Sequence, residues 1–174
     1  MTRYPRVWRA LSCLFLAVAA GCSTSNPQEH LDNGLRYLEQ KQYPEAKLWL
    51  EKSVQLDPGT AETLYYLGLI AREQNEDERA VQDFKKALEL VPSFGDAHVA
   101  LGSTYLKLKN YSTALEELTT AVKLNPDDSR AHYNLAVLYA RLKDQQRAQE
   151  EMQIVEKLKS KKQSKAGDTP GERP

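Results

Sequence analysis

Residues Ala61–Phe94 read AETLYYLGLIAREQNEDERAVQDFKKALELVPSF, and this 34-residue stretch is one copy of a pattern that runs through the chain. One column of prolines, one of glycines that ends in an alanine, and one of alanines each recur every 34 residues. The three columns are Pro58, Pro92 and Pro126; Gly34, Gly68, Gly102 and Ala136; and Ala46, Ala80, Ala114 and Ala148. Three independent columns that share one period predict a repeat protein.

Each column has a physical reason. A glycine in a first helix and an alanine in a second helix are expected where the two helices approach most closely. A larger side chain there would push the helices apart, and such overpacking costs about 1–3 kcal/mol. Proline ends the second helix because it lacks an amide donor and restricts the residue before it. The apolar stripe that remains on each helix is buried only against a neighbouring helix.

Two further columns complete the pattern: Tyr37, Ala71, Tyr105 and Tyr139, and the large apolar residues Leu50, Phe84, Leu118 and Met152. In these residues the chain resembles the tetratricopeptide repeat, which has large–Leu–Gly–Tyr in its first helix and Ala–Phe–Ala–Pro in its second. The resemblance implies an all-α, right-handed solenoid of about four helix-turn-helix units. The expected units are residues 27–60, 61–94, 95–128 and 129–162. Residues 163–174 have no periodicity and are predicted to form a disordered tail.

The N-terminus has the composition of an export signal. Arg3, Arg6 and Arg9 precede an uncharged run over residues 10–21, which is too short for a comfortable membrane span of about 20 residues. The stretch LAVAAGC, residues 16–22, resembles a bacterial lipobox. The resemblance implies a signal peptide over residues 1–21, an acyl lipid such as palmitate on Cys22, and a short tether over residues 22–26. An ordinary signal peptide that happens to contain a cysteine is the alternative.

Cysteine use and charge agree with a lipoprotein. The one other cysteine, Cys13, lies in the expected signal, so the mature chain would form no internal disulfide. Ser23 after the lipidated cysteine implies, in the lipoprotein family, the outer membrane, with the protein facing the periplasm. Removing the signal takes away three of 24 basic residues and none of 24 acidic ones, which leaves a formal charge of −3. Such a balance argues against nucleic acid as a partner.

The sequence contains no pattern typical of catalysis. It has no glycine-rich phosphate loop, no Ser-His-Asp order and no Cys-His pair. His30, His98 and His132 occupy the same position of three repeats, so they are expected to be spread along the array instead of meeting at one metal ion. We therefore expect no enzyme activity, no cofactor and no metal.

The informative surface is the inner face of the first helices, which lines a concave groove in tetratricopeptide proteins. Mapping repeat positions onto this chain predicts a groove formed by Leu35, Tyr65, Tyr66, Leu69, Arg72, Val99, Ser103, Leu106, Tyr133, Asn134, Val137 and Arg141. Leu31 and Leu38 map to the same face. These side chains either contact a partner or pack on adjacent first helices, and the sequence leaves both open.

The function expected from the lipobox and the repeats is a membrane-anchored adaptor or assembly factor in the bacterial cell envelope. Its groove would bind a helix or an extended segment of another envelope protein, while the lipid on Cys22 holds it at the membrane. Lipoproteins of similar layout help to assemble type IV pilus secretins, and others recruit peptidoglycan hydrolases and proteases. A self-associating spacer with no dedicated ligand is the third alternative.

Overall fold

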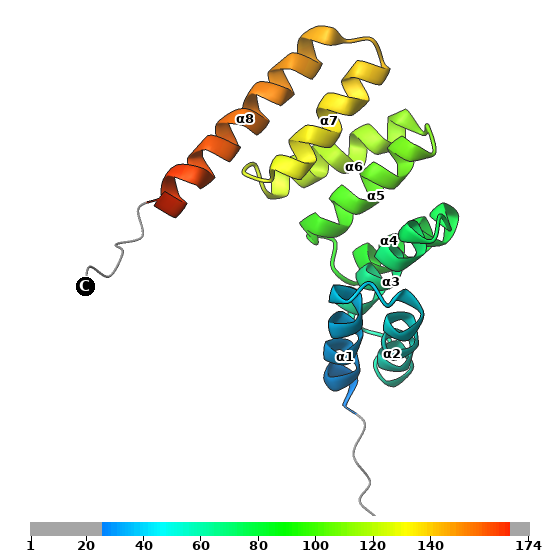
Figure 1. Cartoon of the computed structure of the whole chain (residues 1–174). Coiled ribbons are helices and arrows are strands. Elements are labelled where there is room, and N and C mark those ends of the chain that lie inside the picture. Colours follow the sequence, from blue (N-terminus) through cyan, green and yellow to red (C-terminus); the bar gives the residue numbers. More distant parts are fainter. Residues whose placement is uncertain (1–25, 168–174) are drawn as a thin grey trace, which may run out of the picture.

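The computed structural model describes residues 26–167, which form eight α-helices and no strand (Figure 1). The helices are α1 (Pro27–Glu39), α2 (Tyr43–Leu56), α3 (Ala61–Glu73), α4 (Asp77–Leu90), α5 (Gly95–Lys107), α6 (Tyr111–Leu124), α7 (Ser129–Arg141) and α8 (Gln145–Gly167). The expected signal peptide, Cys22 and most of the tether lie outside the described residues, as do residues 168–174.

The helices pair into four antiparallel hairpins. Each odd-numbered helix packs most extensively on the helix that follows it, and α2, α4 and α6 pack on the next hairpin. Contacts also join α3 to α5 and α5 to α7, so the first helices of successive hairpins lie side by side along one face (Figure 1). The prediction of an all-α, right-handed solenoid of four tetratricopeptide units is confirmed.

The glycine column marks the closest helix contacts. An added Cβ would lie 2.6 Å from the Leu50 side chain at Gly34, 2.6 Å from the Phe84 ring at Gly68, and 2.7 Å from Leu118 at Gly102. None of these glycines has a positive φ, so space and not backbone freedom requires them. The large apolar partners Leu50, Phe84 and Leu118 are all 0% exposed, and they form the core of three hairpins.

Helix ends follow from capping and from proline. The Asn26 side chain accepts a hydrogen bond from the Gln28 amide at 3.0 Å, and Pro27 occupies the first helical position, as the sequence predicts. Each even-numbered helix before a proline ends two residues ahead of it. The residue next to the proline is extended, as at Asp57 with φ −138° and ψ 95°.

The turn inside each hairpin uses a left-handed residue. Lys41, Asn75, Lys109 and Lys143 have φ values of 57–63° and are spaced by the repeat. The amide of the following residue returns to the last turn of the helix, as in the 2.9 Å bond from the Gln42 amide to the Tyr37 carbonyl. This arrangement is a Schellman-type helix end, in which lysine is costlier than glycine or asparagine.

The last helix differs from its prediction. A disordered tail was expected from residue 163, but α8 continues to Gly167. No proline follows Leu158 as it follows Leu56, Leu90 and Leu124, and the lysine-rich sequence over residues 159–167 is compatible with helix. Among the helices of residues 26–167, none combines the length and the hydropathy needed to span a bilayer.

Candidate partner-binding groove

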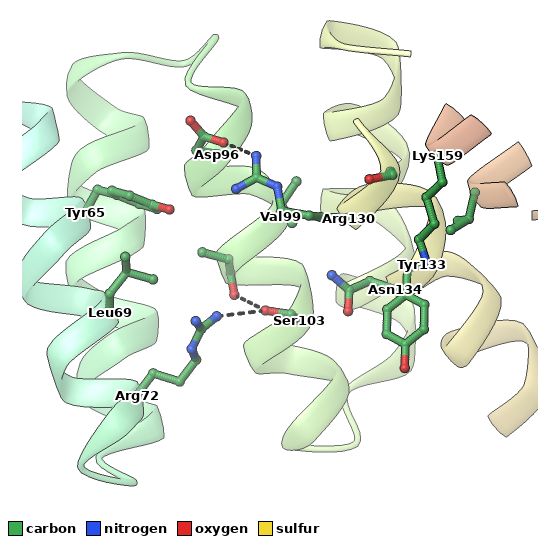
Figure 2. Close-up of a pocket in the computed structure, with 13 residues that line it drawn as sticks. Tyr65, Leu69, Arg72, Asp96, Val99, Ser103, Arg130, Tyr133, Asn134 and Lys159 are labelled. Carbon is green, nitrogen blue, oxygen red and sulfur yellow. Dashed lines mark hydrogen bonds and ion pairs between the residues drawn. The ribbon is translucent and has the colours of Figure 1, made fainter. Parts of the chain in front are cut away.

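The inner face of the solenoid contains a hollow of about 490 Å³ between α3, α5 and α7, closed at one end by α8 (Figure 2). Seven of the predicted groove residues line it: Tyr65, Leu69, Arg72, Val99, Ser103, Tyr133 and Asn134. The repeat register places these side chains together because each comes from the same few positions of consecutive first helices.

A second hollow, of about 400 Å³, continues the first one along α5 and α7. Ser103 lines both hollows, and the second one adds the predicted residues Leu106, Val137 and Arg141. The two hollows thus follow one face of the third and fourth repeats for the length of their first helices.

Leu35 and Tyr66 line neither hollow, contrary to the prediction. Both are partly buried against a core cluster that contains Leu31, Leu50 and Ile70. Leu31, also mapped to the groove, is 1% exposed and belongs to that core, and Leu38 packs against it. Apolar side chains of the first repeat thus pack on the neighbouring core, and neither hollow extends to α1.

The two groove tyrosines differ in their surroundings. Tyr65 is wedged among the rings of Phe84 at 5.9 Å, Phe94 at 5.1 Å and Tyr66 at 5.2 Å between ring centroids. Burial, followed by the nearby Asp96 carboxylate, raises the pKa of the Tyr65 hydroxyl. Tyr133 is 52% exposed. Tyr65 is therefore a fixed wall of the groove, whereas Tyr133 presents an amphipathic ring to a partner.

Polar contacts hold the floor of the groove in place. The Arg72 guanidinium donates to Ser103 Oγ at 3.2 Å, and Ser103 Oγ donates to the Ala100 carbonyl at 2.9 Å (Figure 2). The first bond links α3 to α5. Because the Ser103 hydroxyl accepts one hydrogen bond and donates another, its role is to hold α3 and α5 in position.

Arg130 links the third and fourth repeats. Its guanidinium donates to Asp96 of α5 (Figure 2) and to Asp128, the N-cap of α7, with a 2.8 Å bond to the latter. These hydrogen bonds raise the pKa of Arg130. Burial acts to raise the pKa of Asp128, but hydrogen bonds from the Arg130 side chain and amide outweigh it, so that pKa is lowered. Arg130 and Asp128 therefore stay charged, and the contact of Arg130 with the exposed Asp96 joins α5 to the start of α7.

Sequence reasoning did not assign Asp96, Val155 and Lys159 to the groove, although all three line it. A signal existed for Asp96: it lies 34 residues before Arg130, so opposite charges occupy one position of consecutive repeats. Val155 is 2% exposed, and Lys159 follows it by one helical turn. Lys159 is helical only because α8 continues past Leu158, the residue equivalent to the last one of α2, α4 and α6, and this continuation brings it to the hollow.

The histidines have structural contacts. His98 Nδ1 lies 2.7 Å from Glu117, and its Nε2 donates to the Pro92 carbonyl at 2.9 Å. His132 repeats this arrangement with Glu151 and the Pro126 carbonyl, at 2.7 and 3.0 Å. His30 instead lies against Trp49, with ring centroids 5.3 Å apart and the rings tilted by 37°. Among residues 26–167, no three His, Cys, Asp or Glu side chains come together in a way that would hold a metal ion.

Comparisons with protein families point to the same repeat. A model described as "TPR repeat" matches residues 102–143, and one described as "Tetratricopeptide repeat" matches residues 129–162, the bounds of the fourth expected unit. A model described as "Anaphase-promoting complex, cyclosome, subunit 3" matches residues 39–121. A search of curated proteins found no match.

Solved structures of similar fold include a crystal structure of MamA, with a TM-score of 0.74 and 23% identity over 82% of this chain and 83% of that one. MamA from Desulfovibrio magneticus RS-1 has a TM-score of 0.70 and 20% identity over 78% and 77% of the two chains. YrrB, described as a TPR protein with an unusual peptide-binding site, has a TM-score of 0.67 and 21% identity over 78% and 70%. At these identities the likeness shows the fold.

Proposed function

We propose that this chain, a solenoid of four tetratricopeptide units, is an adaptor that captures a segment of another protein in its inner groove. The observation that carries the proposal is the exposed Tyr133 ring beside a hollow of about 490 Å³ with both apolar and polar walls. Binding sites on proteins combine such aromatic anchors with a few oriented polar groups.

The shape of the groove favours a peptide segment as the occupant. The two hollows meet at Ser103 and follow α5 and α7, so together they form an elongated surface. An elongated groove of this kind suits a helix or an extended strand, which places side chains at regular intervals along it. Arg72, Arg130 and Lys159 outnumber Asp96 in the larger hollow, so a segment with acidic residues is favoured.

The same lining argues for binding over catalysis. Two serines, Ser103 and Ser129, line the larger hollow, and no histidine lines either hollow. Ser103 is held by Arg72 and by the Ala100 carbonyl. A nucleophile needs a base within hydrogen-bond reach. The residues that line the groove therefore fit recognition.

The place of action that we propose rests on the sequence. The lipobox-like residues 16–22 support lipidation of Cys22, and Ser23 supports the outer membrane, with the solenoid in the periplasm. An adaptor there would assemble envelope machinery. Assembly of a type IV pilus secretin is one form of that role, and it would be favoured if the partner that the groove captures is a secretin.

The groove is tested by affinity purification from detergent-solubilised membranes. We expect wild type to retain a specific envelope protein that Tyr133→Ala loses, while Leu90→Ala, a comparably exposed position on α4 outside both hollows, retains it. Circular dichroism checks that both variants fold. Recovery of the same protein with Tyr133→Ala and wild type would refute binding in the groove.

The anchor is tested separately. Cells fed an alkyne analogue of palmitate should label the wild-type chain, and Cys22→Ala should abolish the label. The substitution Cys13→Ala is the matched control, because it changes the only other cysteine and should leave the label in place. An unlabelled wild-type chain would contradict a lipid anchor while leaving the groove proposal intact.

A further inference from the structure

The outward face of α2 differs from the same face of the other second helices. Position 48 is leucine, whereas the equivalent residues in the next repeats are Gln82, Glu116 and Glu150. Position 49 is tryptophan, whereas its equivalents are Asp83, Glu117 and Glu151. Trp49 takes the place of the carboxylates that meet a histidine in the third and fourth repeats, and its ring lies against His30. Leu48 is 53% exposed, so packing within the repeat does not account for an apolar residue at that position.

Four residues form this apolar face: Leu48, Trp49, Lys52 and Leu56. Leu48 is 53% exposed and Leu56 is 47% exposed. Leu48, Lys52 and Leu56 are each one helical turn apart, which gives a stripe about 12 Å long. The partly buried Trp49 ring lies beside the stripe, with Lys52 Nζ 4.6 Å from its centroid. The face thus combines exposed aliphatic side chains, one indole and a lysine.

The face lies close to the point where the chain enters the solenoid. Ser53 Oγ donates to the Pro27 carbonyl at 2.8 Å, which ties the last turns of α2 to the first residue of α1. Cys22 precedes Pro27 by five residues, so the intervening chain spans at most about 17 Å. A lipid on Cys22 would therefore hold the end of the α2 stripe within a short distance of the bilayer.

We propose that the face formed by Leu48, Trp49, Lys52 and Leu56 lies against the lipid surface beside the anchor. This inference rests on the lipid anchor of the proposed function. Indole rings are favoured at the level of lipid headgroups, and lysine keeps its ammonium in the headgroup layer while its stem stays apolar. Glu45 and Asp57 bound the stripe at its two ends, so the contact is shallow. Docking there would orient the groove relative to the membrane.

Fluorescence of Trp49 tests this contact directly. The chain has two tryptophans, Trp8 and Trp49, and the variant Trp8→Phe makes Trp49 the sole emitter whether or not the signal is removed. The lipidated protein is purified in detergent and reconstituted into vesicles of phosphatidylethanolamine and phosphatidylglycerol, with or without bromine on the acyl chains near the headgroup. We expect brominated lipid to quench Trp49 relative to unbrominated lipid, and we expect Trp49 in both kinds of vesicle to emit further to the blue than in the unlipidated Cys22→Ala chain in water.

Substitution separates docking from mere proximity. Leu48→Glu places on α2 the residue type that repeats three and four carry, and we expect about a tenfold fall in the ratio of docked to undocked protein. The matched control Leu124→Glu changes a leucine of similar exposure, 42%, on α6 and should quench like wild type. Equal melting temperatures of Leu48→Glu and wild type confirm that the repeat stays folded.

The outcomes distinguish the two proposals. An anchored protein whose Trp49 emission is the same in brominated and unbrominated vesicles refutes the membrane contact and leaves the anchor standing. If that Trp49 is also shielded from acrylamide in cell membranes, a protein covers the face instead. A chain that carries no lipid refutes the anchor and the membrane contact together.

Discussion

The α-carbon of Gly68 lies so close to the Phe84 ring that a Cβ on it would be 2.6 Å from Cε1 of that ring. Phe84 is 0% exposed and sits in a core cluster shared with Leu101 and Leu118 of the next hairpin. One missing methyl group therefore sets the spacing between α3 and α4, and through Phe84 the position of the following repeat. The groove depends on that spacing, because its walls belong to consecutive first helices.

We expect Gly68→Ala to lower the free energy of unfolding by about 1–3 kcal/mol, because the ring of Phe84 must move within a packed core. Alanine favours the helix more than glycine does, so a loss of stability would report the steric clash with the Phe84 ring alone. Gly95→Ala is the matched control: its added Cβ would have its nearest neighbour, Leu124 Cβ, at 4.0 Å, and no loss is expected. Urea unfolding measures both, and equal stability of Gly68→Ala and wild type would contradict the packing described.

A second prediction concerns Asp83, which occupies the position of Glu117 and Glu151. Those two acids meet His98 and His132, whereas the second repeat has Leu64 at the histidine position. Burial raises the pKa of Asp83 despite the opposing charge of Arg79, and its Oδ2 is buried without a hydrogen bond. A folded pKa above the unfolded one means that the ionised carboxylate destabilises the fold. That penalty is present in full above the folded pKa and disappears as pH falls below the unfolded value.

Asp83→Asn should therefore raise stability at neutral pH, by about 1 kcal/mol, and the gain should shrink to nothing near pH 3. Thermal unfolding of variant and wild type over this range gives the difference directly. Glu116→Gln, an exposed acid on α6, controls for net charge and should change little. A gain that grows on acidification would have the wrong sign for a buried carboxylate.

The left-handed turns offer a stabilising substitution. Lys41 has φ 57°, a conformation that costs an ordinary residue about 1 kcal/mol and costs glycine nothing. Lys41→Gly should raise the melting temperature, and Asn75→Gly should raise it less, because asparagine tolerates the same conformation at φ 61°. Calorimetry of the two variants compares them. A lower melting temperature for Lys41→Gly would show that the strain is absent.

Polar residues at the two ends of the solenoid predict that the protein is a monomer. The residues by which α3, α5 and α7 pack on the preceding hairpin include Leu67, Leu101 and Leu135, all buried, but the equivalent residue of α1 is Asn33. On α8, Gln149 and Glu156 replace the apolar Leu115 and Val122 of α6. Polar ends do not stack on one another, as terminal repeats of solenoids generally do not.

Light scattering of the detergent-solubilised protein should accordingly give the protein mass of one chain at every concentration. Asn33→Leu combined with Gln149→Leu should promote association by exposing apolar ends. A wild-type mass that rises with concentration would support the self-associating spacer and count against the polar caps.

The repeat columns were sufficient to predict the four hairpins, because each column reports a contact that every hairpin makes. The groove was predictable only in part. Repeat position places Tyr133 and Tyr65 on one face, but it does not say that Tyr65 is wedged by Phe94 while Tyr133 stays exposed. That difference depends on neighbouring residues such as Phe94, which the repeat pattern does not specify.

Two misses have the same origin. Leu35 packs into the core of the first repeat, and Lys159 reaches the groove only because α8 continues past the repeat's usual end. Both belong to terminal repeats, where one neighbour is missing and the average pattern no longer holds. The left-handed lysines were also unforeseen, since lysine carries no sequence signal for a positive φ.

Photo-crosslinking in living cells tests capture of a partner in the groove most directly. A photoreactive phenylalanine analogue replaces Tyr133, which is 52% exposed in the groove, or Leu90, which is 43% exposed on α4 outside it. The account predicts a discrete adduct with one envelope protein from position 133 and none from position 90. No adduct from position 133, or the same adduct from both positions, would contradict it.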